Sequence, residues 1–195
     1  MTDSGIMTIG LVLLAYLWGS IPTAVLVCHI LKIPDPRQQG SGNPGTTNVL
    51  RIGTRRAAIL TLLGDTGKGV LALLPCILAD LNFEIRSYCT LAVVLGHLFP
   101  VFSSFRGGKG VATTLGAGIG LFWPLAIIQL LTWGIIAVIG RISSLASIGT
   151  ALTAPIFAWI LIPELTPAYL LLSGLLLFSH RTNIRKLLSA SEPRL

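Results

Sequence analysis

The sequence contains few charged residues. Aspartate, glutamate, lysine and arginine together make up 11% of the 195 residues, whereas 53% of the residues are hydrophobic and the mean hydropathy is +0.82. Soluble domains carry roughly 25% charged residues. This shortage excludes an ordinary soluble domain, and the composition predicts an all-α integral membrane protein.

Metal-binding and disulfide patterns are also missing. The three cysteines, Cys28, Cys76 and Cys89, lie in apolar runs, and none belongs to a CxxC pair. Neither a zinc site nor a disulfide framework is therefore indicated, and no pair of carboxylates suited to metal catalysis occurs. The N-terminal segment has no basic region and no small-residue cleavage site of a signal peptide. We expect no metal, no cofactor and no removed signal peptide.

Apolar runs predict about seven transmembrane helices in a single domain that covers residues 1–195. The predicted spans are 6–31, 57–79, 87–102, 110–123, 125–140, 144–162 and 167–180. Several are shorter than the ~20 residues that a membrane-crossing helix needs. The weakest is 110–123, because Trp123 and Pro124 suggest only a tight outer turn. A five-span alternative, in which this hairpin is re-entrant, stays open.

Positive charge gathers on one predicted side of the membrane. Of the 14 lysines and arginines, all except Lys68 and Arg86 fall in the segments 32–56, 103–109, 141–143 and 181–195. Cytoplasmic loops of membrane proteins carry such an excess of basic residues. The N-terminus is therefore predicted outside, and the C-terminus and the polar glycine-rich loops on the cytoplasmic face. The net charge of +7 is explained by this topology, and nucleic-acid binding is not predicted.

The segment 38–56 is polar and rich in glycine. Its GxGxxG pattern at residues 40–45 matches a dinucleotide-binding fingerprint, but that fingerprint follows a β-strand, and here two prolines precede it. Asn43 before Pro44 predicts instead a helix N-cap, with a short helix running to about Arg51. Exposed glycine N–H groups, a helix N-terminus and an arginine predict an anion site. The alternative is a turn with a basic, topology-setting loop.

A second glycine-rich loop lies within residues 96–116. Glycines surround Lys109, and a predicted helix follows, as in a phosphate-binding turn. A Walker A loop has serine or threonine directly after its lysine, whereas Gly110 stands here, so an ATPase loop is not predicted. His97 lies at a predicted span end close to this loop, and it is a candidate for proton transfer.

Two further motifs carry polar side chains at or inside the spans. Asp65 and Lys68 are three residues apart on one helix face, and each alone would cost about 2.5–3.5 kcal/mol at the membrane centre. They are predicted to form an ion pair, either for helix packing or beside a polar cavity. In the segment 179–187, His180 and Asn183 are less easily explained as interfacial anchors than the basic residues beside them.

Five short motifs along the chain, taken together, resemble those of a known enzyme family. GSGNPGTTNVLR, GDTGKG, GHLFPVFSSFRGGKGVAT, SSLAS and HRTNIRKL, in this order, are similar to motifs of the bacterial acyl-phosphate:glycerol-3-phosphate acyltransferases, PlsY. The resemblance runs from about Ala15 to Leu188. The absence of an HxxxxD motif and of a Ser-His-Asp order agrees with this family.

The resemblance implies a multi-pass enzyme of the bacterial inner membrane with its active site facing the cytoplasm. It would transfer an acyl group from acyl phosphate to glycerol 3-phosphate, giving lysophosphatidic acid and inorganic phosphate for phospholipid biosynthesis. Its partners are these two substrates and membrane lipid, without direct use of CoA or acyl carrier protein and without a covalent acyl-enzyme. The rival interpretation is a transporter or channel for a phosphorylated solute, in which polar breaks lie near the midplane and often in inverted repeats.

The resemblance also implies the site residues. The expected catalytic residues are His97, Lys109 and Arg51. The expected phosphate-binding residues are Ser41, Gly42, Asn43, Asn48, Arg51, Arg106, Gly108, Lys109, Ser144, His180 and Asn183. Two bases stay open for the proton of the glycerol hydroxyl: His97 and the leaving phosphate of the substrate.

Overall fold

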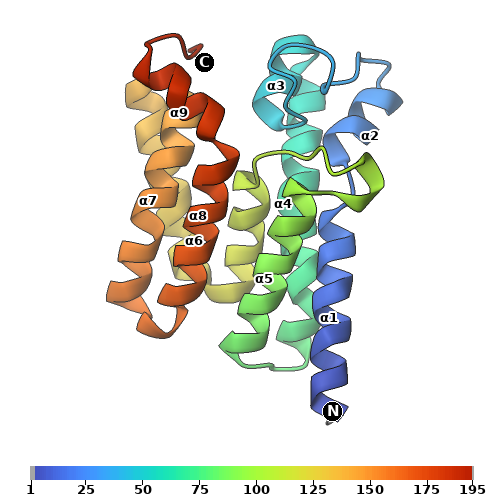
Figure 1. Ribbon diagram of the computed structural model, residues 1–195, viewed down its shortest axis with the longest axis vertical. Helices are drawn as coiled ribbons and strands as arrows, with labels where there is room; N and C mark the ends of the chain where they lie inside the picture. Colours follow the sequence, from blue (N-terminus) through green and yellow to red (C-terminus); the bar gives the residue numbers. More distant parts are fainter. Residues whose placement is uncertain (1–2, 195) are drawn as a thin grey trace. The chain divides into compact units, whose positions relative to one another are not determined.

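The computed structural model describes residues 3–194, which form helices joined by loops without any strand in that range (Figure 1). The predicted all-helical fold is confirmed. The chain divides into two compact units, Met1–Leu121 and Phe122–Leu195. Residues 1, 2 and 195 of the predicted single domain lie outside the described part. The elements are α1 (Asp3–Gly19), α2 (Thr23–Ile30), α3 (Thr46–Ile52), α4 (Arg55–Leu78), α5 (Phe83–Leu98), η1 (Val101–Ser103), α6 (Val111–Gly140), α7 (Ser143–Leu161), η2 (Pro163–Leu165), α8 (Thr166–Ser179) and α9 (Arg181–Leu188).

Five helical stretches of the described chain are long and apolar enough to cross a membrane. They are Gly5–Ile30, Arg55–Leu78, Phe83–Ser103, Val111–Gly140 and Ser143–Leu161, and a shorter apolar helix covers Pro163–Ser179. Val111–Gly140 covers both of the predicted spans 110–123 and 125–140, except for Gly110. The backbone leaves helical geometry at Phe122 (φ −158°, ψ 92°), two residues before Pro124, and so divides this stretch close to the predicted turn.

The predicted span 6–31 agrees with the stretch Gly5–Ile30 to within one residue at each end. A helix break inside it was not predicted: α1 ends at Gly19 and α2 begins at Thr23, and Pro22 between them has no N–H group to continue the helix. One predicted boundary was wrong. The span 87–102 starts too late, because α5 begins at Phe83. The charged residues of its first turn concealed this start, which is capped where the Asn82 side chain accepts a hydrogen bond from Ile85 N at 3.1 Å.

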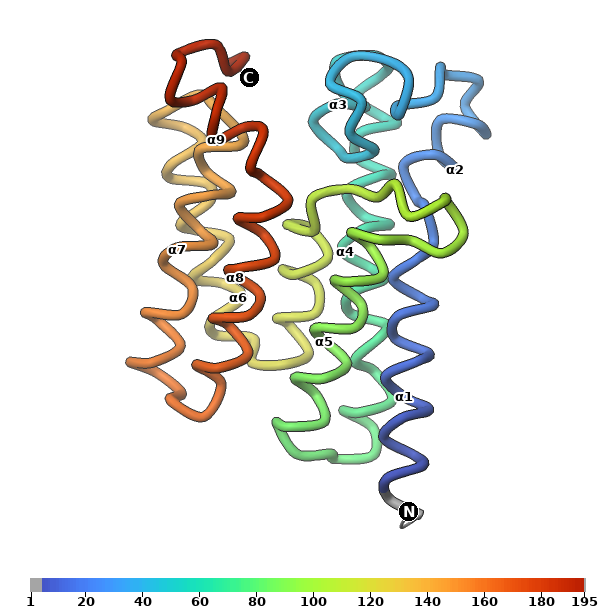
Figure 2. The backbone as a smooth tube through the Cα atoms, in the orientation of Figure 1, coloured from blue at the N-terminus to red at the C-terminus, as the bar shows by residue number. Residues whose placement is uncertain are grey.

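Glycines allow the helices of the first unit to approach closely. A Cβ built on Gly19 of α1 would lie 2.1 Å from the carbonyl oxygen of Val93 in α5, and one on Gly96 of α5 would lie 2.2 Å from that of Tyr16 in α1. Helices α1, α4 and α5 run side by side in Figure 2. Any side chain larger than the hydrogen of glycine at these two positions would force α1 and α5 apart.

A small apolar cluster attaches the polar end of the first unit to this bundle. Ala24 and Cys28 of α2, Val49 of α3 and Ala57 of α4 are buried together. Because α3 follows the glycine-rich segment, this packing fixes where that segment ends. Both glycine-rich loops then lie at the end of this unit opposite to the N-terminus (Figure 1).

The second unit is built around α7 and α8, which are joined through η2 and pack along one another. Tyr169, Leu172 and Leu176 supply a buried face of α8. Trp133 Nε1 in the second half of α6 donates to Ser147 Oγ in α7 at 3.1 Å. Helix α9 follows α8 directly, with only His180 between them.

The contact between α4 and the first part of α6 provides a test of this packing. A Cβ on Gly69 would lie 2.3 Å from Thr113 O and 2.6 Å from Ala117 N, and these backbone atoms cannot rotate away. Gly69→Ala should therefore destabilise the protein by about 1–3 kcal/mol. The measurement is thermal unfolding in detergent, followed by circular dichroism.

Gly67→Ala, two residues earlier in α4, is the matched control. A Cβ there has no neighbour within 4 Å, so the change should be neutral or stabilising by up to about 1 kcal/mol, the difference in helix propensity. Equal stability of the two variants would contradict the close α4–α6 approach.

Candidate active site

Asn48 organises the first glycine-rich loop. Its side-chain oxygen accepts a hydrogen bond from Ser41 N at 2.8 Å, and its amide nitrogen donates to Pro36 O at 2.8 Å and Gln39 O at 3.0 Å. Gly40 has a left-handed φ of +62°, and a Cβ there would lie 2.2 Å from the Asn48 side-chain oxygen. The buried Asn48 side chain therefore wraps the loop around itself, which leaves Ser41 exposed.

The start of the short helix after this loop was predicted wrongly. Helix α3 begins at Thr46, its N-cap is Gly45, and no side chain makes a capping hydrogen bond. Asn43 is not the N-cap, because its carbonyl accepts the Gly45 N–H at 2.9 Å and closes a tight turn before the helix. The helix ends at Ile52, and Arg51 lies exposed in its last turn.

The second glycine-rich loop is compact and has an unusual backbone. Ser104 and Phe105 adopt left-handed φ angles of 50° and 58°, and Gly110 has a φ of 88° just before α6 begins. The N–H of Gly108 donates to the carbonyl of His97 at 3.1 Å. The loop thus folds back onto the end of α5, with half-buried Lys109 next to the start of α6.

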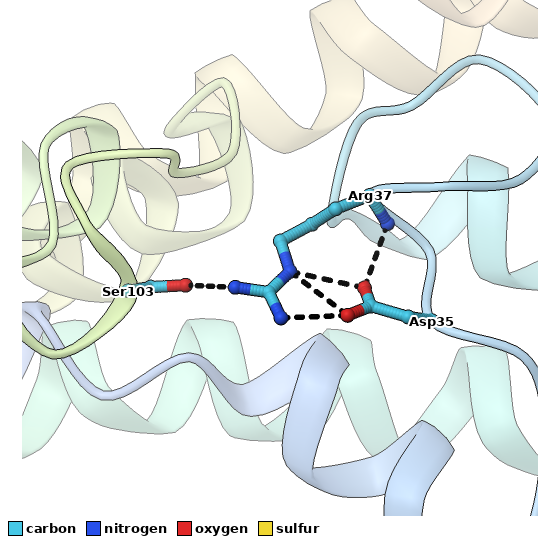
Figure 3. A network of polar contacts seen from close by, with 3 residues as sticks. All are labelled: Asp35, Arg37 and Ser103. Atoms are coloured by element: carbon cyan, nitrogen blue, oxygen red, sulfur yellow. Dashed lines mark hydrogen bonds and ion pairs between the residues drawn. The ribbon is translucent and has the colours of Figure 1, made fainter.

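The two loops are linked by a polar contact that the sequence analysis missed. Arg37 donates to both carboxylate oxygens of Asp35 through Nε and Nη2, and its Nη1 donates to Ser103 Oγ at 2.7 Å (Figure 3). This contact borders a cleft of about 460 Å³ lined by Arg37, Gln38, Ser103, Ser104 and Arg106. Arg37 and Ser103 are 66 residues apart, so no local spacing signals their contact.

The predicted intramembrane charges form a buried cluster next to these loops. Lys68 Nζ lies 3.1 Å from Asp65 Oδ1, and His97 Nδ1 lies 3.4 Å from the same oxygen. Thr23 Oγ1 also donates to this oxygen, and Lys68 Nζ donates to Ile21 O at 3.1 Å. The cluster therefore joins the break between α1 and α2 to α4 and α5.

The remaining predicted site residues lie in the second unit. Ser144 Oγ and Asn183 Nδ2 each donate to Glu192 Oε1 at 2.6 Å. The ring of His180 is buried, with Nδ1 2.8 Å from Leu176 O. Glu192 was missed because it lies in a short polar tail without a motif of its own. Its position shows that Ser144 and Asn183 can share one anionic group.

Several apolar helices that carry glycine-rich polar loops at their ends define a multi-pass membrane protein. The sequence profile of the glycerol-3-phosphate acyltransferase family matches residues 9–190. The chain is 48% identical over 183 residues to the glycerol-3-phosphate acyltransferase of Methylococcus capsulatus, covering 93% of this chain and 92% of that protein. It is 49% identical over 187 residues to the one of Thioalkalivibrio sulfidiphilus, covering 95% and 92%.

Solved structures agree with these relatives. The structure of PlsY, an integral membrane glycerol 3-phosphate acyltransferase, in its glycerol 3-phosphate form matches with a TM-score of 0.91 at 34% identity, covering 97% of this chain and 96% of that chain. The lysophosphatidic acid form matches with a TM-score of 0.89 at 34% identity, covering 97% and 95%. The chain belongs to the glycerol-3-phosphate acyltransferase family. The resemblance to PlsY and the prediction of an acyltransferase are confirmed, and the transporter interpretation is not supported.

The Asp35–Arg37 contact predicts a pH dependence of stability. The hydrogen bonds from the Arg37 side chain lower the pKa of the Asp35 carboxyl below its ordinary value, although partial burial opposes them. A carboxyl with a lowered pKa stabilises the folded state above its unfolded pKa of about 3.9, and this contribution is lost as the pH falls through the folded pKa. Asp35→Asn should therefore be about 1 kcal/mol less stable near pH 6, and the difference should begin to shrink below about pH 4 as the pH falls toward the lowered pKa of the folded state.

The measurement is the thermal midpoint of both proteins in detergent between pH 3 and pH 7. Asp80→Asn is the control, because the Asp80 side chain is fully exposed and its ion pair with Arg86 is long, at 3.4 Å. Solvent screens such a pair, so it contributes little to stability. It should match the wild type at every pH. A stability difference for Asp35→Asn that does not change with pH would contradict the ionic contact.

Proposed function

We propose that this chain transfers an acyl group from acyl phosphate to glycerol 3-phosphate and releases lysophosphatidic acid and inorganic phosphate. The observation that carries the proposal is the meeting of the two glycine-rich loops in the first unit, in a chain that belongs to this family. Arg37 reaches Ser103, and a Cβ on Gly108 would lie 3.2 Å from Pro44 O. Both substrates carry phosphate, and two adjoining glycine-rich loops with exposed basic side chains nearby, among them Arg51 and Arg106, suit two anions.

The roles of the individual residues are part of this proposal. Arg51 and Lys109 neutralise phosphate charge, and the exposed Ser41 and Gly42 present polar groups from the first loop. Arg106 borders the cleft between the loops. Asn43 and Gly108 belong to the loops, and the Asn48 side chain of α3 holds the first loop in place, so these three residues set the positions of the others. Ser144, His180 and Asn183 stay predictions as phosphate ligands, supported by the shared Glu192 carboxylate.

The chemistry needs no covalent enzyme intermediate. A hydroxyl oxygen of glycerol 3-phosphate attacks the acyl carbonyl carbon, and the bond from that carbon to the phosphate oxygen breaks as the ester forms. The hydroxyl proton passes to the leaving phosphate. The protein contributes alignment of the two substrates and stabilisation of the charge on the leaving group. The surroundings of His97 favour this substrate-assisted route, because its ring is buried between Asp65 and Gly108.

The finer topology is likewise proposed. Counting Val111–Gly140 as two segments around Phe122 and adding Pro163–Ser179 gives the predicted seven spans. The basic loops orient these spans with the N-terminus outside, the C-terminus inside and the active site facing the cytoplasm of a bacterial inner membrane. One family profile spans both compact units, which supports the prediction of a single acyltransferase domain.

The direct test is an assay of the purified protein with acyl phosphate and labelled glycerol 3-phosphate, scored for lysophosphatidic acid. Product should form without CoA or acyl carrier protein. It should also form in EDTA, because lysine and arginine are proposed to neutralise the phosphates alone. No product from folded protein would contradict the proposed function, and loss on chelation that magnesium restores would contradict the metal-free mechanism.

The same assay tests the proposed phosphate contacts. Arg51→Ala and Lys109→Ala should each lower kcat/KM about ten- to a hundred-fold, since a charge-assisted hydrogen bond contributes ~1.5–3 kcal/mol. Arg51→Lys should stay impaired, because a point charge does not reproduce the planar fork of arginine. Arg55→Ala and Arg56→Ala, in the first turn of α4, are the controls. Wild-type kinetics for Arg51→Ala and Lys109→Ala would refute their role.

The orientation predicts which loops a membrane-impermeant thiol reagent reaches. In a background without native cysteines, single cysteines at Gln39, Ser104 and Ser189 should be labelled only from the cytoplasmic side. A cysteine at Glu84 should be labelled from outside. Labelling of any of the first three from outside alone would overturn the proposed topology.

A further inference from the structure

The buried Asp65–Lys68–His97 cluster lies directly below the second glycine-rich loop. Residue exposures are 3% for Asp65, 5% for Lys68 and 7% for His97. The charges of Asp65 and Lys68 compensate one another at 3.1 Å. Lys68 also donates to Ile21 O, and Thr23 donates to Asp65, so the cluster is anchored on both sides of Pro22, where α1 gives way to α2.

His97 carries this anchoring to the loop through two contacts. Its carbonyl accepts the Gly108 N–H at 3.1 Å. Its ring lies against the same glycine, because a Cβ on Gly108 would be 2.2 Å from His97 Nε2. On the neighbouring Gly107, a Cβ would be 2.0 Å from the His97 carbonyl oxygen. Gly107 and Gly108, the two residues before Lys109, therefore pack against the backbone carbonyl and the ring of His97.

Gly108 also lies close to the first loop, because the same built Cβ position is 3.2 Å from Pro44 O. A series of neighbouring groups thus runs from Asp65 through His97 and Gly108 to Pro44. The cavity along this series measures only about 10 Å³, which is the space of a single water. This space does not hold a phosphate group in this structure, which supports a role for these side chains beneath the loops.

We infer that Asp65 and Lys68 are positioning residues of the acyl transfer reaction, which orient His97 so that it seats Gly107 and Gly108 and sets the place of Lys109 relative to the first loop. The inference rests on the proposed function. Asp65 Oδ1 lies 3.4 Å from the buried His97 Nδ1, which has no hydrogen bond to residues 3–194, so this carboxylate is the polar group nearest to that side of the ring and orients it electrostatically. Lys68 pairs with the Asp65 carboxylate at 3.1 Å and, through its hydrogen bond to Ile21 O, attaches it to the α1–α2 break.

Kinetics separates this role from simple helix packing. Asp65→Asn and Lys68→Met each leave one buried charge unpaired, so each should lower the thermal midpoint. The double variant removes both charges and should regain most of the midpoint. Its kcat/KM should nevertheless stay lower by about ten- to a hundred-fold, the effect of a small misplacement of reacting groups. Thr61→Val, one turn earlier in α4, is the control: this buried hydroxyl has no partner among residues 3–194, and the variant should keep wild-type kinetics.

A distance measurement gives a readout that does not depend on activity. Spin labels are placed on cysteines at the exposed Gln39 and Ser104, one in each loop, after the three native cysteines are replaced by alanine. The distance distribution should be narrow with the native cluster and with Thr61→Val. It should be broad or displaced in the double variant and in His97→Ala, which keeps both charges and is available if the double variant does not fold.

The outcomes are distinct. If the double variant regains the thermal midpoint, the kinetics and the narrow distribution together, the cluster only packs helices and the inference is wrong. An unchanged distribution in His97→Ala would also overturn it. If the labelled loops respond as expected but the wild type makes no lysophosphatidic acid, the positioning holds and the proposed function fails.

Discussion

The burial of the Asp65 carboxylate in an apolar helix bundle constrains the first unit more than any other interaction. An unpaired carboxylate at the centre of a membrane helix costs about 2.5–3.5 kcal/mol, so its oxygens require partners. Lys68, Thr23 and His97 supply them from α4, α2 and α5. The helix break at Pro22 becomes part of the same arrangement, because Lys68 also binds the carbonyl of Ile21. A single charge thereby ties three helices together at the level where the polar loops begin.

Glycine acts at two scales in this unit. Within the bundle, Gly19 and Gly96 bring α1 and α5 to backbone contact, which places the end of α5 beside the α1–α2 break. At the polar end, Gly107 and Gly108 let the second loop lie directly on His97. Both effects depend on the missing side chain, since any Cβ at these positions would meet backbone or ring atoms. The close packing of α1 on α5 and the close approach of the second loop to His97 therefore have a common physical origin.

The polar side chains near the loops divide into those that build the loops and those that face outward. The Asn48 side chain forms its hydrogen bonds within the first loop, and the Arg37 guanidinium donates hydrogen bonds to Asp35 and Ser103. Such internally bonded groups hold shape. Arg51, by contrast, is exposed at the end of α3, where its side chain is accessible for the proposed binding of a phosphate. This division explains why not every polar residue in a shared motif needs to touch the substrate in the proposed reaction.

The sequence alone was sufficient to predict the membrane class, the helical fold, the family and the pairing of Asp65 with Lys68, because each depends on composition, on apolar run length, on motif order or on spacing within one helix. It misplaced the cap at Asn43, where a local hydrogen bond from Gly45 N–H decides the boundary, and it missed the helix break at Pro22. It also missed the partners of Arg37, whose contact with Ser103 spans 66 positions. Only the tertiary structure brings His97 under Gly108 and Gly108 against Pro44. These contacts depend on how closely the helices pack, and that is set by backbone geometry in three dimensions, which no pattern along the chain records.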